Sequence, residues 1–302
     1  MSLGPESITQ QPVRTRSAGS ESYLATIARR LIKHKLAMIG IVLVVLLLLF
    51  CYVGPYFSPY DYTRSSLFNR FQSPSRDAHW MGTDELGRDV LTRVMMGGRV
   101  SLAVGFLVAL SSVVVGGSIG ALSGYLGGWV DHVIMRFVDF MLSIPLLPIL
   151  MITAYVLGPN FRNMVFVLVA FGWMGICRIV RGQVLSIKQQ EFVEGARAIG
   201  CSDVRIIFKH VLPNSIAPII VSATLGIGGA ILSESYLSYL GLGVQLPTPS
   251  WGNMLMGARQ YLSTAPWLAI WPGVFIFLTL LAFNFIGDGL RDALDPKLHN
   301  RR

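Results

Sequence analysis

The stretch "LAMIGIVLVVLLLLFCYV", residues Leu36–Val53, contains no Asp, Glu, Lys or Arg. A helix needs about 20 mainly apolar residues to cross the hydrocarbon core of a bilayer, so this stretch predicts a membrane-spanning helix. The whole chain has the same character: 53% of its 302 residues are hydrophobic and only 14% are charged, against about 25% in soluble domains. Roughly 35 mostly polar residues precede the stretch and no small-x-small site follows it, so we interpret it as a retained anchor and not as a cleaved signal peptide.

Five further runs without charge follow along the chain. Most reach the length that a span requires, and a shorter one spans if Arg178 and Arg181 extend their charged ends to the membrane surface. We therefore predict an all-α polytopic membrane protein with six transmembrane helices. The five runs cover residues 100–130, 140–161, 163–177, 211–233 and 260–287.

Lysine and arginine set the expected orientation. They are concentrated in the leader, in the segment around residues 178–213 and in the tail, so the positive-inside rule places both termini in the cytoplasm. This topology accounts for much of the net charge of +9, and no nucleic-acid partner is expected. It divides the chain into a cytoplasmic leader (1–35), a first span with an external segment (36–99), a main transmembrane domain (100–290) and a cytoplasmic tail (291–302). Within the leader, residues 1–22 have a composition typical of disorder.

The sequence contains no convincing catalytic or metal site. Cys51, Cys177 and Cys201 suggest no pairing, and the five histidines lack the spacing of metal ligands. Residues 116–120 match the G-x-S-x-G nucleophile elbow of hydrolases, but an elbow needs a preceding strand and Asp and His partners. Here Ser118 falls within an apolar helix, so we predict that the chain is not an enzyme.

Gly116, Gly120 and Gly124 recur at intervals of four residues in the second span. Small residues on one face allow another helix to approach closely, so these glycines predict a packing surface between helices. Pro145 and Pro148 predict a kink in the third span, which either a moving or a static helix can use.

The end of the external segment reads "GTDELGRDVLTRVMMGGR", residues 82–99. Its apolar residues recur at helical spacing among charges of both signs, which predicts a short amphipathic helix on the outer membrane face. Gly97 and Gly98 are then expected to turn the chain inward.

A charged interruption, residues 189–213, separates two of the spans. Good helix formers run from residue 189 to 199, and Gly200 follows where a left-handed C-terminal cap is expected. Ser202 or Asp203 can cap a second helix, which Pro213 is expected to end. The interruption therefore predicts two short helices at an angle.

The first of these helices is expected to be amphipathic, with Phe192, Ala196 and Ile199 on its apolar side. Two helices joined at a glycine also describe a helix-turn-helix, but both flanks continue into spans, so DNA could not be enclosed. The residue pattern leaves open whether the interruption is a passive surface loop or a docking element.

The interruption resembles the cytoplasmic EAA loop of ABC importer permeases, in which Glu-Ala-Ala is followed by Gly and then by Leu-Pro at fixed spacing. The corresponding residues here are Glu194, Gly195, Ala196, Gly200, Leu212 and Pro213. Gly195 replaces the middle Ala of the motif and His210 replaces Ile. Gly195 lowers the helix propensity of its segment by up to about 1 kcal/mol relative to Ala, so we expect a partner to help order that helix.

Three more stretches resemble the C-type permease subunit of dipeptide, oligopeptide and nickel importers. They are "GTDELGRDVLTRV" (82–94), "LGLGVQLPTPSWGNML" (240–255) and "LAFNFIGDGLRDALDPK" (281–297). The resemblance implies a type I ABC importer transmembrane domain in the bacterial inner membrane, which forms half of a pathway for peptides. It also implies a second permease subunit, two ATP-binding subunits and an external solute-binding protein. The chain lacks G-x-x-x-x-G-K-[ST], so ATP and Mg²⁺ are expected on the partners and no cofactor on this chain.

Two alternatives remain at this stage. Import of nickel chelates would use the same architecture. An ion-coupled secondary transporter would need ionisable residues near the midplane, whereas Asp139, Arg178 and Glu234 fall near the ends of predicted spans. Glu234 is expected either to face the pathway near its outer mouth or to lie at the membrane interface. The sequence identifies no substrate-binding residue.

Overall fold

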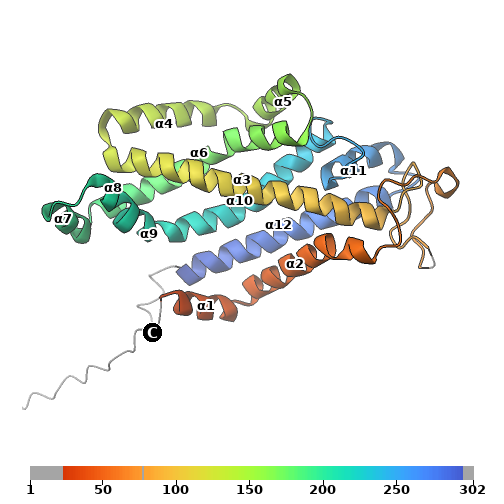
Figure 1. Ribbon diagram of the computed structural model, residues 1–302, viewed down its shortest axis with the longest axis horizontal. Helices are drawn as coiled ribbons and strands as arrows, with labels where there is room; N and C mark the ends of the chain where they lie inside the picture. The colour runs from red at the N-terminus through yellow and green to blue at the C-terminus, as the bar shows by residue number, and fades with distance from the viewer. Residues whose placement is uncertain (1–22, 77, 295–302) are drawn as a thin grey trace, which may run out of the picture.

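The computed structural model describes residues 23–76 and 78–294, which form an elongated bundle of helices (Figure 1). The predicted disorder of residues 1–22 and the last part of the predicted tail, 295–302, lie outside the described residues. Five helices are long and apolar enough to cross a membrane, and a bent pair of helices supplies a sixth crossing. The five are α2 (Lys35–Tyr52), α3 (Val90–Leu126), α6 (Phe161–Lys188), α10 (Ile216–Tyr239) and α12 (Trp267–Leu294). The predicted fold class, all-α with six spans, is confirmed.

The two ends of the bundle carry different shorter elements (Figure 1). One end, called here the α7 end, carries α7 (Glu191–Ala198), α8 (Asp203–Ile206), a π-helical stretch (Ile207–Val211) and α9 (Leu212–Asn214). The other end, called the α11 end, carries α11 (Trp251–Ala258), residues 54–89 and three 3₁₀ helices, Gly54–Phe57, Leu67–Asn69 and Arg259–Tyr261. Helix α1 (Tyr23–Lys33) precedes α2 at the α7 end.

Helix α3 begins earlier than the sequence predicted. The expected separate helix over residues 82–99 is wrong: the helix starts at Val90 and continues through Gly97 and Gly98 without a turn. The Asp89 side chain fixes this start by accepting a hydrogen bond of 2.8 Å from the Thr92 amide. At Gly98 a Cβ atom would overlap the side chains of Cys51 and Trp251, so this glycine allows α2 and α11 to approach α3.

Helices α3 and α6 pack backbone to backbone along the glycines at residues 116, 120 and 124. A Cβ atom at Gly116 would overlap the Trp173 carbonyl, and one at Gly120 would overlap the Cys177 carbonyl. At Gly124 the nearest atom is the Arg181 carbonyl oxygen, 2.9 Å from the ideal Cβ position. Small residues on one face of α3 therefore determine how closely these two spans approach.

The crossing expected over residues 140–161 is divided into two helices. Helix α4 (Gly128–Ser143) runs back along the bundle, and α5 (Leu146–Leu157) leaves it at an angle of 91°. Pro145 occupies the N-cap position of α5, where its missing N–H removes no helical hydrogen bond. The predicted kink is confirmed, and it forms a complete break between helices.

Helix α6 is longer than the charge-free run over residues 163–177 because it includes Arg178 and Arg181. The two arginines do not need to extend to a membrane surface, since both reach acidic residues of α4. Arg178 pairs with Asp139, and Arg181 donates two hydrogen bonds, of 2.5 and 2.6 Å, to Asp131. Charge pairing between two neighbouring helices replaces the predicted snorkelling.

Candidate functional site

The turn between α7 and α8 has the geometry that the sequence predicted. Gly200 has φ +83°, a left-handed conformation that favours glycine. Its amide donates to the Arg197 carbonyl at 3.0 Å, and the Cys201 amide donates to the Ala196 carbonyl at 3.1 Å. These two bonds form a Schellman motif. Ser202 occupies the N-cap of α8, but its side chain makes no capping hydrogen bond.

The buried side of α7 differs from the predicted one. Val193 and Ala196 are buried, in one cluster with residues of α6 and α8, whereas Phe192 and Ile199 are exposed. Helix α7 is too short for a face that extends over seven residues, because Ile199 already lies beyond its last turn. Phe192 and Ile199, with Val204 of α8, are therefore apolar side chains that this chain leaves uncovered, and they are called here the uncovered apolar surface; their exposed fractions are 44%, 81% and 66% in the order Phe192, Ile199, Val204.

Pro213 does not end the helix that precedes it. The chain remains helical to Asn214, and the interruption comes at Ser215, directly before α10. Pro213 lacks an amide hydrogen, and the π-helical stretch Ile207–Val211, which ends two residues before it, provides a wider local helix geometry. The helical segment from Asp203 to Asn214 is thus separated from α10 by Ser215 alone.

Glu194 and Gly195 of the predicted motif lie on the outer surface of this segment. Glu194 is exposed in the first turn of α7, and Gly195 beside it is exposed with no atom within 4 Å of an ideal Cβ position. Ala196 faces the bundle, and Leu212 is partly buried against the same cluster. The motif therefore contributes both to an outer surface and to the attachment of that surface to the spans.

Glu234 is completely enclosed by this chain, with an exposed fraction of 0%. Its carboxylate accepts hydrogen bonds from the hydroxyls of Ser101 in α3, at 2.9 Å, and Ser238 in α10, at 2.7 Å. The Ser101 oxygen also accepts from the Trp251 amide at 3.3 Å. The isolated subunit therefore places Glu234 at neither of the two expected positions: it connects α3, α10 and α11.

Residues 82–94 form a compact polar cluster at the α11 end. Asp84 accepts hydrogen bonds from the Arg88 amide, at 2.9 Å, and from the Arg88 side chain, at 2.7 Å. Arg93 approaches the same carboxylate at 3.4 Å, and His79 approaches Asp89 at 2.8 Å. The first and last of these contacts order residues 79–89, and the Asp84–Arg93 pair holds this segment to the start of α3.

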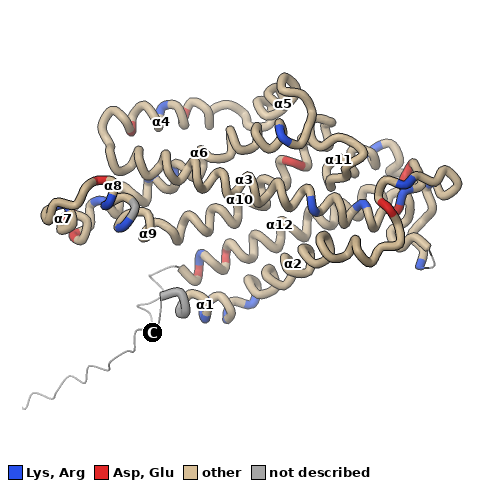
Figure 2. The backbone as a smooth tube through the Cα atoms, viewed as in Figure 1, with Lys and Arg blue, Asp and Glu red and all other residues tan. Residues whose placement is uncertain are grey.

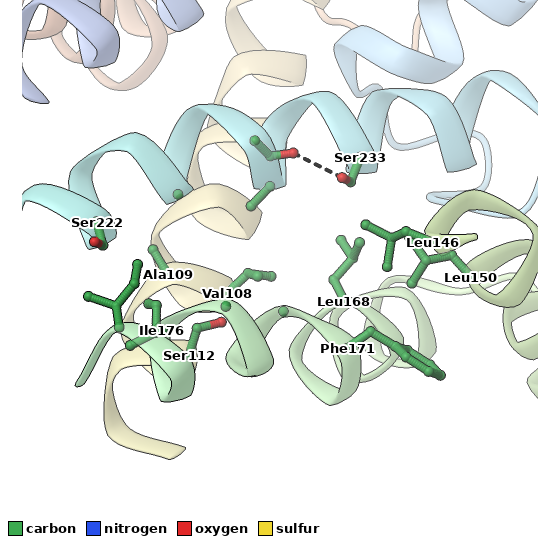
Figure 3. A pocket seen from close by; sticks show the side chains of 16 residues that line it. Val108, Ala109, Ser112, Leu146, Leu150, Leu168, Phe171, Ile176, Ser222 and Ser233 are labelled. Carbon is green, nitrogen blue, oxygen red and sulfur yellow. Dashed lines mark hydrogen bonds between the residues drawn. The ribbon is translucent and has the colours of Figure 1, made fainter. Parts of the chain in front are cut away.

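A cavity of about 350 Å³ lies between α3, α5, α6 and α10 (Figure 3). Its wall contains no charged side chain and consists of apolar residues, glycines and the three serines Ser112, Ser222 and Ser233. Ser233 donates its hydroxyl to the Gly229 carbonyl at 2.9 Å, within α10. The wall is therefore neutral and presents few polar groups that would select one side chain over another.

Comparisons with known proteins identify the family. A model described as "binding-protein-dependent transport system inner membrane component" matches residues 116–300, more than half of the chain. The chain belongs to this family. A second model, the "N-terminal TM domain of oligopeptide transport permease C", matches residues 22–74.

Several curated permeases are similar to this permease over most of its length. The dipeptide transport system permease protein DppC of Alkalihalophilus pseudofirmus is 43% identical, over 89% of this chain and 88% of that protein. The oligopeptide transport system permease protein OppC of Bacillus subtilis is 42% identical, over 88% and 87%. The glutathione transport system permease protein GsiD of Pectobacterium atrosepticum is 40% identical, over 89% and 90%. The permease is accordingly a multi-pass protein of the bacterial inner membrane.

Tyr125, which the sequence did not single out, attaches the α7–α8 segment of this permease to its spans. It is the last residue but one of α3, and its hydroxyl donates to Asp203 at 2.5 Å. Lys188 donates to the Tyr125 carbonyl at 2.5 Å, and the cationic groups of Lys188 and Arg197 lie 5.5 and 5.9 Å from the ring centroid. The tyrosine hydroxyl also raises the pKa of Arg197 above its ordinary value. One residue thus joins α3, α6, α7 and α8.

Proposed function

We propose that this permease forms half of the translocation pathway of an ATP-driven importer and that a second permease subunit supplies the other half. Of the two ATP-binding subunits of such an importer, one docks from the cytoplasm on residues 189–213 of this permease, where Glu194, Gly195, Ala196, Gly200, Leu212 and Pro213 lie. ATP and Mg²⁺ bind to those subunits. Residues 1–35 and 291–302 are cytoplasmic, and the external segment 58–99 and the loop 241–266 face an external solute-binding protein.

The uncovered apolar surface of Phe192, Ile199 and Val204 is the observation that carries the docking proposal. These side chains lie at the α7 end, beyond the long apolar helices, on a segment that also carries exposed charges. Large apolar side chains exposed to water are unfavourable, and three of them within one short segment support its role as a protein–protein interface. Val193 and Ala196 share one buried cluster with residues of α3 and α6, and Tyr125 of α3 is hydrogen-bonded to Asp203 of α8 and Lys188 of α6. Through these contacts a displacement of the α7–α8 segment is transmitted to the spans.

Peptides are the cargo that the relatives and the cavity support best. The relatives' names specify dipeptides, oligopeptides and glutathione, which is itself a small peptide. A neutral cavity with a few serine hydroxyls can accept varied side chains. The described residues contain no group of three His, Cys, Asp or Glu that could hold a metal ion, and none of the relatives named above is a nickel permease, so the nickel-chelate alternative is not favoured.

The docking proposal can be tested at Ile199. Because this side chain is 81% exposed, Ile199→Ser removes apolar contact area without disturbing the packing of the isolated chain. Burying such a side chain contributes about 1.5–3 kcal/mol, so we expect the affinity for the ATP-binding subunits to fall at least about tenfold. Copurification of the subunits and ATP-driven peptide uptake into proteoliposomes measure the effect.

Ala198→Ser is the matched control for Ile199→Ser. Ala198 is exposed one position earlier and offers little apolar area, so its replacement is expected to leave binding and uptake nearly unchanged. Undiminished binding and uptake in Ile199→Ser would refute the docking of ATP-binding subunits on this surface.

A further inference from the structure

Three charged side chains lie exposed deep within the length of the bundle. Asp139 of α4 and Arg178 of α6 form an ion pair in which both side chains are half exposed, 56% and 53% respectively. Asp139 lies about 17 Å along α4 from its start at Gly128, and Arg178 lies about 15 Å along α6 from its end at Lys188. Arg136, one turn before Asp139, is also exposed. Among the described residues it forms no ion pair. Figure 2 shows that α4 carries both charge signs along its length.

This depth corrects the expectation that Asp139 and Arg178 lie near span ends. Helices α4 and α5 together form the bent crossing, which begins at Gly128 and ends at Leu157, so Asp139 lies inside that crossing and not at its start. Helix α6 extends beyond the charge-free run, so Arg178 lies well before its end.

Helix α4 has three different sides. Met135 and Val138 are buried in a cluster with residues of α6. Phe137 and Phe140 are exposed and apolar, as a lipid-facing side requires. A third side carries His132, Arg136 and Asp139 at positions i, i+4 and i+7, and all of these are exposed.

Helix α6 continues this polar surface. After Phe166 the exposed residues of α6 are small or polar apart from Ile179, which is 40% exposed, whereas the exposed residues of α2 are large and apolar. The small and polar line on α6 consists of Gly172, Gly175, Arg178, Gly182 and Ser186; on α2 the exposed residues include Leu36, Ile39, Val42, Leu46 and Leu49. Gly172 and Gly175 of this line also contribute to the wall of the cavity, so one end of the line borders the cavity.

Lipid is a poor neighbour for the charged side of α4 and α6. Exposed charges in hydrocarbon are costly, and charged residues within spans characteristically face a water-filled path. The small and polar line on α6 and the cavity beside it indicate that the path runs along this surface.

We propose that Arg136, Asp139 and Arg178 form a contact site for the charged groups of a passing peptide, with Arg136 as the group that receives a carboxylate. This proposal rests on the proposed function of peptide import. Asp139 offers its partly exposed carboxylate to a peptide ammonium group, and Arg178 holds Asp139 in place. The site contains two cationic groups and one anionic group, so it favours peptides with an additional carboxylate over neutral peptides of the same size.

The test compares two dipeptides of equal shape, Ala-Glu and Ala-Gln, in the reconstituted importer with saturating, peptide-loaded binding protein. The readout is the ratio of their maximal import rates, from which any general loss of assembly or ATPase activity cancels. Arg136→Gln is expected to lower the ratio of Ala-Glu to Ala-Gln import about fivefold, the effect of one exposed charge contact, and Arg136→Glu to lower it further. Arg136 forms no ion pair with another described residue, so neither substitution breaks an ion pair within the described structure.

Arg291→Gln is the matched control, because Arg291 is an exposed arginine in the last turn of α12, which packs against α2. Its ratio is expected to equal that of the unaltered permease. An unchanged ratio in both Arg136 variants, with import of the two peptides either retained or lost in parallel, would overturn the contact site while leaving peptide import intact. Failure of the unaltered importer to transport either dipeptide would instead refute the peptide assignment, and the ligand of the site with it.

Discussion

At the scale of single residues, Glu234 shows what sequence reasoning could not reach. The sequence indicates an acid near the end of a span, and both expected positions followed from that placement. Its actual environment depends on Ser101, which is 133 positions away, and on the start of α11. No local pattern encodes a contact between residues so distant, whereas the cap at Gly200 is set by its immediate neighbours and was predicted correctly.

The hydrogen bonds of Glu234 predict a graded response to substitution. Glu234→Leu leaves the hydroxyls of Ser101 and Ser238 without their acceptor inside a packed region, and each buried unpaired group costs about 1–3 kcal/mol. Glu234→Gln retains one side-chain oxygen as acceptor and is expected to cost less. Thermal unfolding of the detergent-solubilised permease should therefore show a drop of several degrees for Glu234→Leu and a smaller one for Glu234→Gln. Equal stability of the two variants would contradict the role of these hydrogen bonds.

At the scale of elements, hydropathy predicted that the spans exist but misplaced several of their boundaries. A charge-free run ends at the first charged residue, whereas a helix ends where its backbone hydrogen bonds end. Helix α6 therefore continues past Arg178 and Arg181, whose charges are paired with α4. Helix α3 includes Gly97 and Gly98, because those glycines permit close packing instead of making a turn.

The contact between α3 and α6 can be tested with two glycines of the same helix. Gly120→Ala would place a methyl group against the Cys177 carbonyl, whereas an ideal Cβ at Gly117 has no atom within 4 Å outside the adjacent backbone. Replacing Gly by Ala within a helix by itself stabilises the helix by up to about 1 kcal/mol. We expect Gly117→Ala to be neutral or slightly stabilising and Gly120→Ala to destabilise by about 1–3 kcal/mol through overpacking. Thermal unfolding of both variants measures the difference, and a Gly120→Ala permease as stable as Gly117→Ala would argue against direct contact of the two backbones.

At the scale of the whole molecule, six crossings bring both described chain ends to the same end of the bundle as α7 (Figure 1). This agrees with a sequence that concentrates Lys and Arg in the leader, the α7–α8 segment and the tail. The number of crossings could be predicted because each span is encoded locally by apolar residues. The polar surface that we propose to face the pathway could not be predicted, because it arises from α4 and α6 lying together after the chain has folded.

The proposed orientation has a direct chemical test. In a Cys201→Ser background the remaining cysteines, Cys51 and Cys177, are buried with 0% exposure and should not react with a maleimide. Lys33→Cys at the α7 end and Ser65→Cys at the α11 end then add one exposed thiol each. The positive-inside rule places Lys33 in the cytoplasm and Ser65 outside. A membrane-impermeant maleimide is expected to label Ser65→Cys in intact cells and Lys33→Cys only after the cells are opened, as measured by the mass of the labelled permease. Labelling of Lys33→Cys in intact cells would reverse the topology and place residues 189–213 out of reach of any cytoplasmic ATP-binding subunit.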